Sequence, residues 1–416
     1  MSPSLRRSAA LLLFVAVLGA PASLALARDD GPSDFSAAEV EDHWFAAWAG
    51  PAQDTSTAAT PRVFDADTTI REPVWVTLGG RRVRVKFSNA MGTLPVTIGA
   101  ASVAIRSADS SVDPSTIRQL TFGGKPSVDV PSQGLVLSDA VELDVPALTD
   151  VSVSIYLPHG SPPATQYPGS KKTTYVATGD ATLDPVFPTA STLANGYFVA
   201  AVEVRSRSAG GVVAALGDSI VAGGGSTGEN TKWSDRLAAR LDALPDHQAK
   251  SVLGLGIGGN RMLSGAITNP AALARFDRDV LGMAGLTHVI MADGINDLGA
   301  TAADPTKPPF AEDVANGLRQ IVARAHARGV KVIGTTMGPA WGFRGYEAVE
   351  SKRLAYNAWV RSEGVKLVDG LVDFDAVLRD PADPSHMNPL YLTDGIHPNN
   401  LGHQAMADAV NLLLLK

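Results

Sequence analysis

The 416-residue chain contains no cysteine. This absence excludes disulfide bridges, cysteine nucleophiles, lipid attachment at a cysteine and thiolate metal sites. Stability must therefore come from core packing, and a chain of this length with 45% hydrophobic residues can build two well-buried cores. Long apolar runs are also missing. Beyond residue 27 none approaches about 18 uninterrupted residues, so we expect no membrane-spanning segment.

Positive charge is in short supply. The formal net charge is −7, and it becomes two units more negative if Arg6 and Arg7 are removed with the N-terminal segment. A chain this acidic is a poor general binder of phosphate backbones, which argues against nucleic acid as a partner. Because only 19% of the residues are charged, the composition is that of a globular protein rather than a disordered one.

The N-terminus is typical of a secretory signal peptide. An arginine pair is followed by an apolar segment over residues 9–20, which is too short to span a bilayer comfortably. Ala25-Leu-Ala27 then fits a small-x-small cleavage site. We predict a signal peptide over residues 1–27, cleavage before Arg28 and a secreted protein, extracellular or periplasmic. The alternatives are a membrane anchor and, for the arginine pair, a twin-arginine export route.

Residues 28–206 are predicted to form a β-rich domain. Valines alternate with basic residues from Arg81 to Phe87, and clusters of Pro, Gly, Ser and Asp interrupt the segment at short intervals. This texture is typical of a β-sandwich or jelly-roll-like domain. The basic residues of that strand form either a ligand-binding face or a solvated sheet face; they are Arg82, Arg84 and Lys86. The stretch SRSAGG at 206–211 marks a boundary.

Residues 212–416 alternate between strand and helix patterns, which predicts an α/β domain with a parallel sheet covered on both faces. The expected strands are 212–216, 251–253, 287–292, 330–335 and 366–368. The expected helices are 233–244, 271–283, 312–328, 347–362 and 401–415. In such sheets the reactive groups gather in the loops after the carboxyl ends of the strands.

Four loops fall at that edge. They are Gly217-Asp-Ser-Ile220, Gly254-Leu-Gly-Ile-Gly-Gly-Asn260, Asp293-Gly-Ile-Asn-Asp297 and Asp394-Gly-Ile-His-Pro398. Ester hydrolysis by serine needs a hydroxyl, a base and a group that orients the base. His397 has the best context for a base, because Asp394 lies three residues earlier in a loop that can fold the carboxylate onto the imidazole. Ser219 is then the nucleophile.

The tetrahedral intermediate needs hydrogen-bond donors for its oxyanion. We expect them from the backbone N–H groups of Ser219 and Gly259 and from the side-chain amide of Asn296. Three other histidines have weaker contexts; they are His288, His326 and His403. A zinc site built from His397, His403 and Asp394 is an alternative, but it lacks a clear third nitrogen ligand.

Two motifs compete with this interpretation. Ser226 lies in Gly-Gly-Ser-Thr-Gly, which matches the G-x-S-x-G nucleophile elbow, but the strand has ended by Gly217 and Ser226 lies deep in the following loop. The stretch 254–259 matches G-x-G-x-x-G after a strand. A dinucleotide site also needs an acidic residue at the end of the next strand, and the candidates Asp277 and Asp279 fall in a helical stretch.

Taken together, the four loops resemble the four blocks of the SGNH (GDSL-type) hydrolases, in family order, over residues 212–416. The resemblance implies a flavodoxin-like α/β/α sandwich, the triad Ser219-His397-Asp394, an oxyanion hole from Ser219, Gly259 and Asn296, and no cofactor. Isoleucine replaces the usual leucine in the first block, and Gly254 stands where asparagine often begins the second. Gly258 is the neighbouring choice for the second-block glycine.

A β-rich domain before such a domain looks like some secreted carbohydrate esterases, which remove acetyl groups from plant polysaccharides. The leading hypothesis is therefore a secreted serine esterase whose partner is an acyl-ester substrate, short-chain or carbohydrate-borne. A lipase or lysophospholipase is the second hypothesis, and a non-catalytic carbohydrate-binding surface protein is the third. Trp341, in the loop 337–345, either lines the substrate pocket or serves packing.

Overall fold

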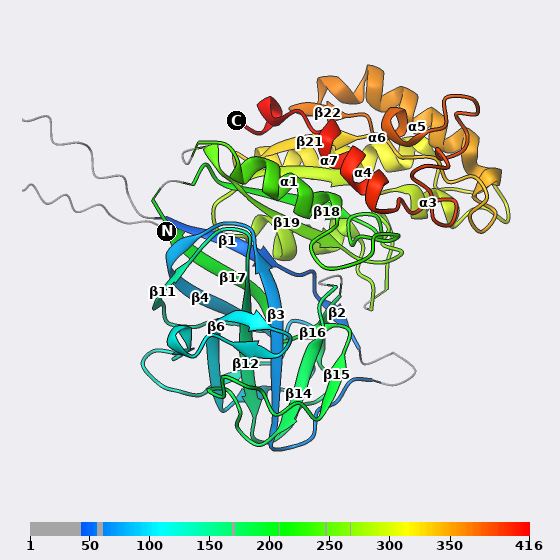
Figure 1. Cartoon of the computed structure of the whole chain (residues 1–416). Coiled ribbons are helices and arrows are strands. Elements are labelled where there is room, and N and C mark those ends of the chain that lie inside the picture. Colours follow the sequence, from blue (N-terminus) through cyan, green and yellow to red (C-terminus); the bar gives the residue numbers. More distant parts are fainter. Residues whose placement is uncertain (1–42, 56–60, 169–170, 208, 246–247, 267) are drawn as a thin grey trace, which may run out of the picture. The chain divides into compact units, whose positions relative to one another are not determined.

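A computed structural model describes residues 43–55, 61–168, 171–207, 209–245, 248–266 and 268–416 (Figure 1). These residues belong to one compact unit. The predicted signal peptide over residues 1–27 lies outside the described residues. Within them, no helix is both long enough and apolar enough to cross a bilayer.

The first part of the chain forms two large antiparallel sheets. The first has the order β1 (His43–Ala49), β17 (Val199–Ser206), β4 (Gly80–Ser88) and β10 (Leu135–Leu137), and β11 (Val141–Val145) also pairs with β4. The second has the order β15 (Ser191–Leu193), β14 (Thr174–Thr178), β3 (Thr68–Val76), β12 (Thr149–Leu157), β6 (Ala100–Ala108) and β7 (Ser111–Val112), with β8 (Arg118–Gln119) on β6.

Short strands complete this β-rich region. They are β2 (Gln53–Asp54), β13 (Thr165–Tyr167) and β16 (Gly196–Tyr197) in one small sheet and β5 (Val96–Ile98) with β9 (Val128–Val130) in another. Apolar residues from both large sheets, such as Val85 of β4 and Val153 of β12, are buried in one core. The alternation in the sequence places them there, because successive side chains of a strand point to opposite faces. The predicted β-rich domain is confirmed.

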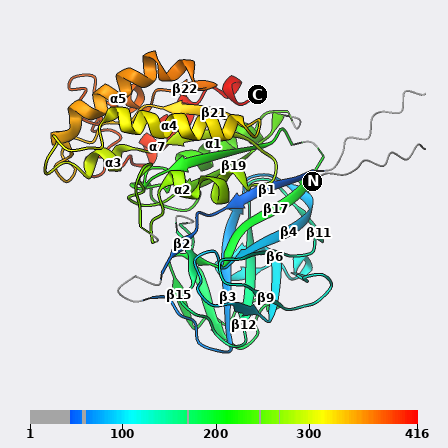
Figure 2. The ribbon, with the colours of Figure 1, turned by 180° about the vertical axis from the view of Figure 1, so that it is seen from behind.

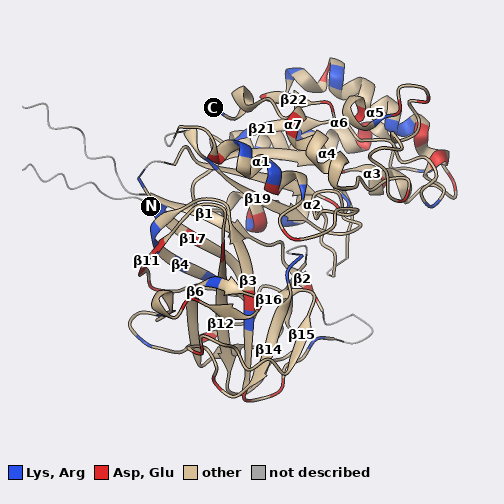
Figure 3. Cartoon of the chain, viewed as in Figure 1, with Lys and Arg blue, Asp and Glu red and all other residues tan. Residues whose placement is uncertain are grey.

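The basic row of β4 is engaged by carboxylates on neighbouring strands. Arg84 and Lys86 both pair with Glu203 of β17, and Arg82 pairs with Glu142 of β11. Figure 3 shows basic and acidic residues beside each other in this part of the β-rich region. The two alternatives for this row were a ligand face and a solvated face. The ion pairs fit a polar outer face whose charges are matched within the sheet.

The second part of the chain is a parallel sheet with the order β19 (Ser251–Gly256), β18 (Val212–Gly217), β20 (Leu286–Ala292), β21 (Lys331–Thr335) and β22 (Gly370–Val372). The first strand in sequence therefore lies between the second and the third, which is the flavodoxin-like order. The predicted α/β architecture is confirmed.

Helices cover both faces of this sheet (Figures 1 and 2). They are α1 (Trp233–Asp242), α2 (Ala272–Phe276), α3 (Ile295–Gly299), α4 (Ala311–His326), α5 (Glu350–Ser362), α6 (Phe374–Leu378) and α7 (Asn400–Ala409). Val213 of β18 packs with α1, α6 and α7, whereas Ala214 on the opposite face packs with α2, α4 and α5. Both faces are apolar because both are buried.

Several boundaries differ from the sequence prediction; among them, the second strand extends to Gly256 and α5 begins at Glu350. The last strand is Gly370–Val372 rather than 366–368, because residues 364–366 form a 3-10 turn directly after α5. The closing helix ends at Ala409; the Asn411 side chain then accepts a hydrogen bond from the Leu413 backbone and starts a separate 3-10 turn. The helix predicted over 271–283 is α2 followed by a π-helical turn, Asp277–Leu281.

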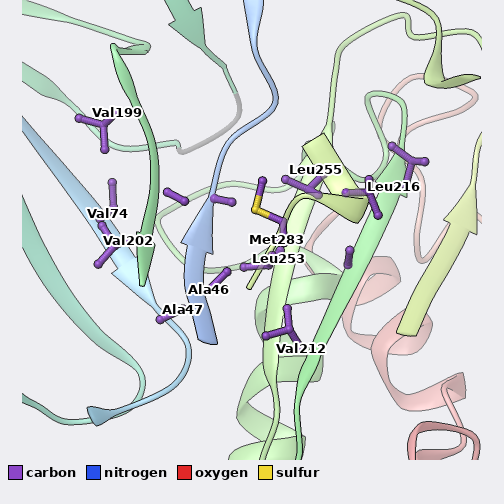
Figure 4. Close-up of a cluster of buried hydrophobic side chains, with 14 of the residues drawn as sticks. Ala46, Ala47, Val74, Val199, Val202, Val212, Leu216, Leu253, Leu255 and Met283 are labelled. Atoms are coloured by element: carbon purple, nitrogen blue, oxygen red, sulfur yellow. The ribbon is translucent and has the colours of Figure 1, made fainter. Parts of the chain in front are cut away.

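The β-rich region and the α/β region share a buried core (Figure 4). Ala46 of β1 donates a backbone hydrogen bond to the Ala284 carbonyl at 2.9 Å. The hydroxyls of Thr77 and Ser251 are 2.8 Å apart and buried. Apolar residues from both regions are buried together here; among them are Val74, Val202, Val212, Leu253 and Met283.

Candidate active site

Ser219 lies in a tight turn that follows β18 at the carboxyl edge of the parallel sheet. The turn is held by two backbone hydrogen bonds, from Ala222 N to Asp218 O at 3.0 Å and from Gly224 N to Ser219 O at 2.6 Å. A side chain at Gly217 would collide with the Ala292 carbonyl of β20. The turn therefore starts where the sequence places a glycine, and it leaves the serine hydroxyl partly exposed.

His397 approaches from the loop before α7. The Thr393 backbone and hydroxyl both donate to the His397 carbonyl, at 3.1 and 2.7 Å, and close this loop. Asn399 then caps α7, because its side chain accepts hydrogen bonds from the first N–H groups of the helix. The Phe343 ring packs edge-on against the imidazole, with ring centres 5.4 Å apart.

The predicted hydroxyl, base and carboxylate form one hydrogen-bond chain. Ser219 Oγ lies 2.8 Å from His397 Nε2, and His397 Nδ1 lies 2.7 Å from Asp394 Oδ2. A carboxylate only accepts hydrogen bonds, so Nδ1 carries the proton and Nε2 is left to accept from the serine. The arrangement has the geometry of a nucleophile beside its base.

The surroundings of Asp394 favour its ionised form. Partial burial opposes its charge, but hydrogen bonds from the side chain and backbone of His397 outweigh this effect and lower the pKa of the carboxyl. Its other oxygen accepts the His397 backbone N–H at 3.0 Å. The carboxylate therefore holds the loop and the imidazole at the same time.

The three predicted oxyanion donors differ in how they are engaged. Within the described residues, the backbone N–H groups of Ser219 and Gly259 donate no hydrogen bond, so both are open to a ligand oxygen. Gly259 has a φ of +68°, which favours glycine, and it directly precedes the buried Asn260. The Asn296 amide donates to the Asn260 carbonyl at 3.0 Å and makes a longer contact, 3.4 Å, with Asp218 Oδ2.

Sequence reasoning missed a partner of Asn296. The Tyr346 hydroxyl donates to Asn296 Oδ1 at 3.0 Å, which fixes the orientation of the amide. The Tyr346 ring also packs edge-on against Phe343. No spacing rule links these residues to Asn296, because Tyr346 follows it by 50 positions and begins a separate 3-10 turn.

Three buried carboxyl groups lie beneath the site. Burial raises the pKa of Asp218 to about 6, and burial together with its two acidic neighbours raises the pKa of Asp293 well above its usual range. Asp297 accepts the backbone N–H groups of Met262 and Leu263, at 2.7 and 2.9 Å, and so holds the loop after Gly259. The segment 293–297 thus supplies both the Asn296 amide and the Asp297 carboxylate that holds the neighbouring loop.

The competing motifs have structural explanations. Ser226 is 7% exposed, and its hydroxyl donates to the Gly223 carbonyl at 2.8 Å. A side chain at Gly256 would collide with the Ala222 backbone, so this glycine of the G-x-G-x-x-G match serves packing. Asp279 pairs with arginines of its own helical segment.

The weaker histidines are also accounted for. His403 is fully buried, and both ring nitrogens bond to backbone: Nδ1 accepts from Trp233 N at 3.2 Å, and Nε2 donates to Gly224 O at 3.0 Å. It is therefore unavailable for the alternative zinc site. His326 pairs with Asp369, and His288 bonds to its neighbour Thr287.

The missing asparagine of the second block also has a physical reason. A Cβ at Gly254 would lie 3.3 Å from the ammonium nitrogen of Lys232 and 3.0 Å from the Ser234 hydroxyl. Polar groups of α1 and its N-terminus thus fill the place that an asparagine side chain would need.

A hollow of about 430 Å³ opens beside Gly259. It is lined by Gly259, Arg261, Ser264, Gly265, Ala266 and Asn269. Trp341 lies on the loop after β21, is 38% exposed and packs its ring 5.5 Å from that of His386.

Part of the chain matches the model of a known protein family. The model of the GDSL-like lipase/acylhydrolase family matches residues 215–405. This range includes all four loops named above and excludes the β-rich region. Among curated proteins, no match to the chain was found.

Solved structures with similar folds match about half of the chain. A GDSL-like lipase from Bacteroides thetaiotaomicron has 19% identity and a TM-score of 0.35, with 50% of this chain and 88% of that one covered. An α/β hydrolase from the Lake Arreo metagenome, LAE5, has 25% identity, coverage of 49% and 94%, and a TM-score of 0.38. A mutant of Axe2, an acetyl-xylooligosaccharide esterase from Geobacillus stearmophilus, has 20% identity and a TM-score of 0.39, with 48% of this chain and 92% of that one covered.

Proposed function

We propose that this hydrolase, whose residues 215–405 belong to the GDSL-like lipase/acylhydrolase family, is a secreted serine esterase that cleaves short-chain or carbohydrate-borne acyl esters. The observation that carries the proposal is the hydrogen-bond chain from Ser219 Oγ through His397 to Asp394, with distances of 2.8 and 2.7 Å. Open backbone N–H groups at Ser219 and Gly259 add to its support.

The proposed reaction uses each group in turn. His397 Nε2 takes the Ser219 proton while Oγ attacks the ester carbonyl carbon, and Asp394 stabilises the imidazolium that forms. The oxyanion accepts hydrogen bonds from the backbone N–H groups of Ser219 and Gly259 and from the Asn296 amide. His397 then protonates the departing alkoxide, which leaves an acyl-serine. Water, deprotonated by the same imidazole, hydrolyses this ester and restores the enzyme.

Two features support small or carbohydrate-borne esters. The hollow beside Gly259 is open and bordered mainly by small or polar residues, with Arg261 as its one charged member. Trp341 presents a partly exposed ring on a loop whose Phe343 touches His397, and a flat aromatic surface of this kind suits a sugar ring. Neither feature offers the long apolar channel that a fatty acyl chain would fill.

Secretion is proposed from the sequence alone. The arginine pair, the apolar segment over residues 9–20 and the site Ala25-Leu-Ala27 together make a signal peptide. Export would bring the enzyme to esters outside the cell. Sequencing the N-terminus of the exported protein tests this part: a first residue of Arg28 supports it, and retention of the intact chain inside the cell contradicts it.

The proposed chemistry is tested by labelling the purified protein with a fluorophosphonate and mapping the modified peptide. We expect modification at Ser219 alone, and loss of labelling in Ser219→Ala but not in Ser226→Ala. Modification at Ser226 would contradict the assignment. A folded protein without any labelling would favour the non-catalytic carbohydrate-binding alternative.

The substrate class is tested with an acyl-length series of p-nitrophenyl esters and with acetylated polysaccharide. We expect the highest kcat/KM at acetyl or a similarly short chain and release of acetate from the polysaccharide. Rates that rise with acyl length and increase at lipid interfaces would instead assign the site to lipid esters. Both results presuppose labelling at Ser219, so failure of the substrate class is distinguishable from failure of the mechanism.

A further inference from the structure

The segment of residues 223–230, here called the glycine loop, links Ser219 to the start of α1. We propose that basic residues of the β-rich region, led by Lys171, hold the glycine loop in the position that keeps Ser219 and His397 within hydrogen-bond distance. The β-rich region is then part of the catalytic assembly, and Lys171 is a positioning residue. This inference rests on the proposed function, since it concerns the alignment of the same serine and histidine.

The glycine loop touches both groups whose distance matters. Its Gly224 backbone N–H donates to the Ser219 carbonyl at 2.6 Å. A Cβ at Gly224 would lie only 2.5 Å from His397 Cδ2 and 3.1 Å from Nε2, so the loop backbone packs directly against the imidazole. Because packed groups transmit displacement to their neighbours, a shift of this loop moves the imidazole or opens a gap beside it.

The same loop is tied to the segment that carries the histidine. Thr227 N donates to Asn400 Oδ1 at 2.9 Å, and the Asn400 amide donates back to the Thr227 carbonyl at 3.1 Å. His403 Nε2 donates to Gly224 O at 3.0 Å. Asn400 and His403 belong to the first turns of α7, directly after His397. The glycine loop therefore spans the serine side and the histidine side of the site.

On its outer side the loop is held by Lys171, which lies between β13 and β14 of the β-rich region. Lys171 Nζ donates to the Ser226 carbonyl at 2.6 Å. Gly223 allows this approach, because a Cβ there would lie 3.0 Å from Lys171 Cε and would also collide with Lys232. The lysine itself has a φ of +56°, an uncommon conformation for a residue with a side chain. Two segments have thus adapted their backbones to one contact.

A second tie fixes the far end of the loop. Glu229 Oε2 accepts from Lys172 Nζ at 2.8 Å and from Arg106 Nη1 at 2.9 Å. Both cations also pair with Asp150 of β12, at 2.9 Å. The Lys172 side chain is only 2% exposed, whereas Glu229 is 40% exposed, so the ammonium group of this network is shielded from water. A network of two acids and two bases is stiffer than a single surface pair.

The substitution Lys171→Met tests the proposal, because methionine keeps an unbranched side chain but cannot donate to Ser226. The matched control is Lys86→Met. Lys86 Nζ of β4 also donates to a backbone carbonyl of the α/β region, Gly282 O at 3.2 Å, but away from the glycine loop. We expect Lys171→Met to lower kcat and the rate of fluorophosphonate labelling about tenfold with KM within about twofold. Lys86→Met should keep both rates.

Two further variants separate positioning from general stability. Lys171→Arg retains a donor and should recover most of the lost kcat, whereas Glu229→Gln should lower kcat by a smaller factor because it removes charge but keeps an acceptor. Thermal unfolding is measured for every variant. If Lys171→Met folds less well, the arginine and glutamine variants carry the test.

Each outcome of these measurements either supports or overturns the proposal. A loss of kcat in Lys171→Met that the arginine variant reverses, with Lys86→Met unaffected, supports the proposal. Equal activity in wild type and both methionine variants overturns it, as does a loss that follows the unfolding temperature in Lys171→Met and Lys86→Met alike. A wild-type protein that neither labels nor hydrolyses esters would instead overturn the proposed function, which makes the two failures distinct.

Discussion

Two serines and two histidines lie in the same part of the molecule and can be compared as two pairs, because their hydrogen-bond partners differ. Ser219 and His397 bond to each other at 2.8 Å, and the imidazole bonds to a carboxylate on its other side. Ser226 and His403 instead each bond to a backbone carbonyl of the glycine loop, at 2.8 and 3.0 Å. A carbonyl oxygen accepts a hydrogen bond but cannot remove the proton, so the second pair is held in place rather than activated.

Burial separates the pairs as well. His403 is fully buried, and its desolvation lowers the pKa of the imidazole to about 4, which keeps it neutral near neutral pH. The His397 side chain is 17% exposed at the edge of the site. The same two residue types therefore bond to each other where a carboxylate and solvent are available, and bond to backbone carbonyls where they are enclosed.

The largest effect that separates the pairs is expected on kcat. Ser219→Ala removes the proposed nucleophile and should lower kcat by about 10⁴-fold or more. Ser226→Ala removes one hydrogen bond inside the glycine loop and should keep kcat within about fivefold, because this serine touches neither histidine. Hydrolysis of p-nitrophenyl acetate measures both. Full activity in Ser219→Ala would reverse the comparison.

A second substitution tests what the carboxylate adds to the reactive pair. Asp394→Asn keeps the size of the side chain but presents an amide N–H where the carboxylate accepts from His397 Nδ1, which favours the wrong imidazole tautomer. We expect kcat to fall about 10²- to 10⁴-fold. Asp408→Asn, on the exposed side of α7, is the control and should retain activity. An unchanged kcat in Asp394→Asn would show that the backbone alone orients His397.

A third and smaller effect concerns the oxyanion. Asn296→Ala should lower kcat about 10²-fold, because it removes a donor that strengthens its bond as charge develops. Tyr346→Phe leaves that donor in place and removes only the bond that orients it, so a loss of about three- to tenfold is expected. Labelling rates with the fluorophosphonate report the same step. A larger loss in Tyr346→Phe than in Asn296→Ala would contradict the assigned roles.

The blocks of the site were predictable because their information is local. A strand that ends at Gly217 fixes where Ser219 lies, and the three-residue spacing from Asp394 to His397 lets one loop hold both groups. The order of strands in the parallel sheet then brings separate loops to one edge. These regularities also told Ser219 from Ser226, since only one of them directly follows a strand.

The supports of the site were not predictable, because they come from distant segments. Tyr346 contacts Asn296 from a 3-10 turn 50 positions later, and Lys171 contacts the glycine loop from the β-rich region; no sequence motif indicates either contact. The strand at 370–372 was misplaced for a related reason. Residues 366–368 and 370–372 are similarly apolar, and only pairing with Ile333 of β21 selects the second.

For the buried pair, the expected effect is on the pH dependence of the free energy of unfolding, through His403, rather than on catalysis. Because the folded pKa of His403 lies near 4 and an exposed histidine titrates near 6.5, its neutral form stabilises the fold fully above about pH 6.5. That stabilisation is lost as the pH falls from 6.5 towards 4. The variant His403→Gln should have a lower free energy of unfolding than the wild type at pH 7.5. Because glutamine takes up no proton, this deficit should shrink by about 2 kcal/mol between pH 7.5 and 5. Chemical unfolding of both proteins at the two pH values measures this.

Comparing the two proteins cancels the titration of His288 and of the buried carboxyls, which both contain. A deficit that stays constant would mean that His403 keeps an ordinary pKa inside the fold, and that burial does not separate it from His397.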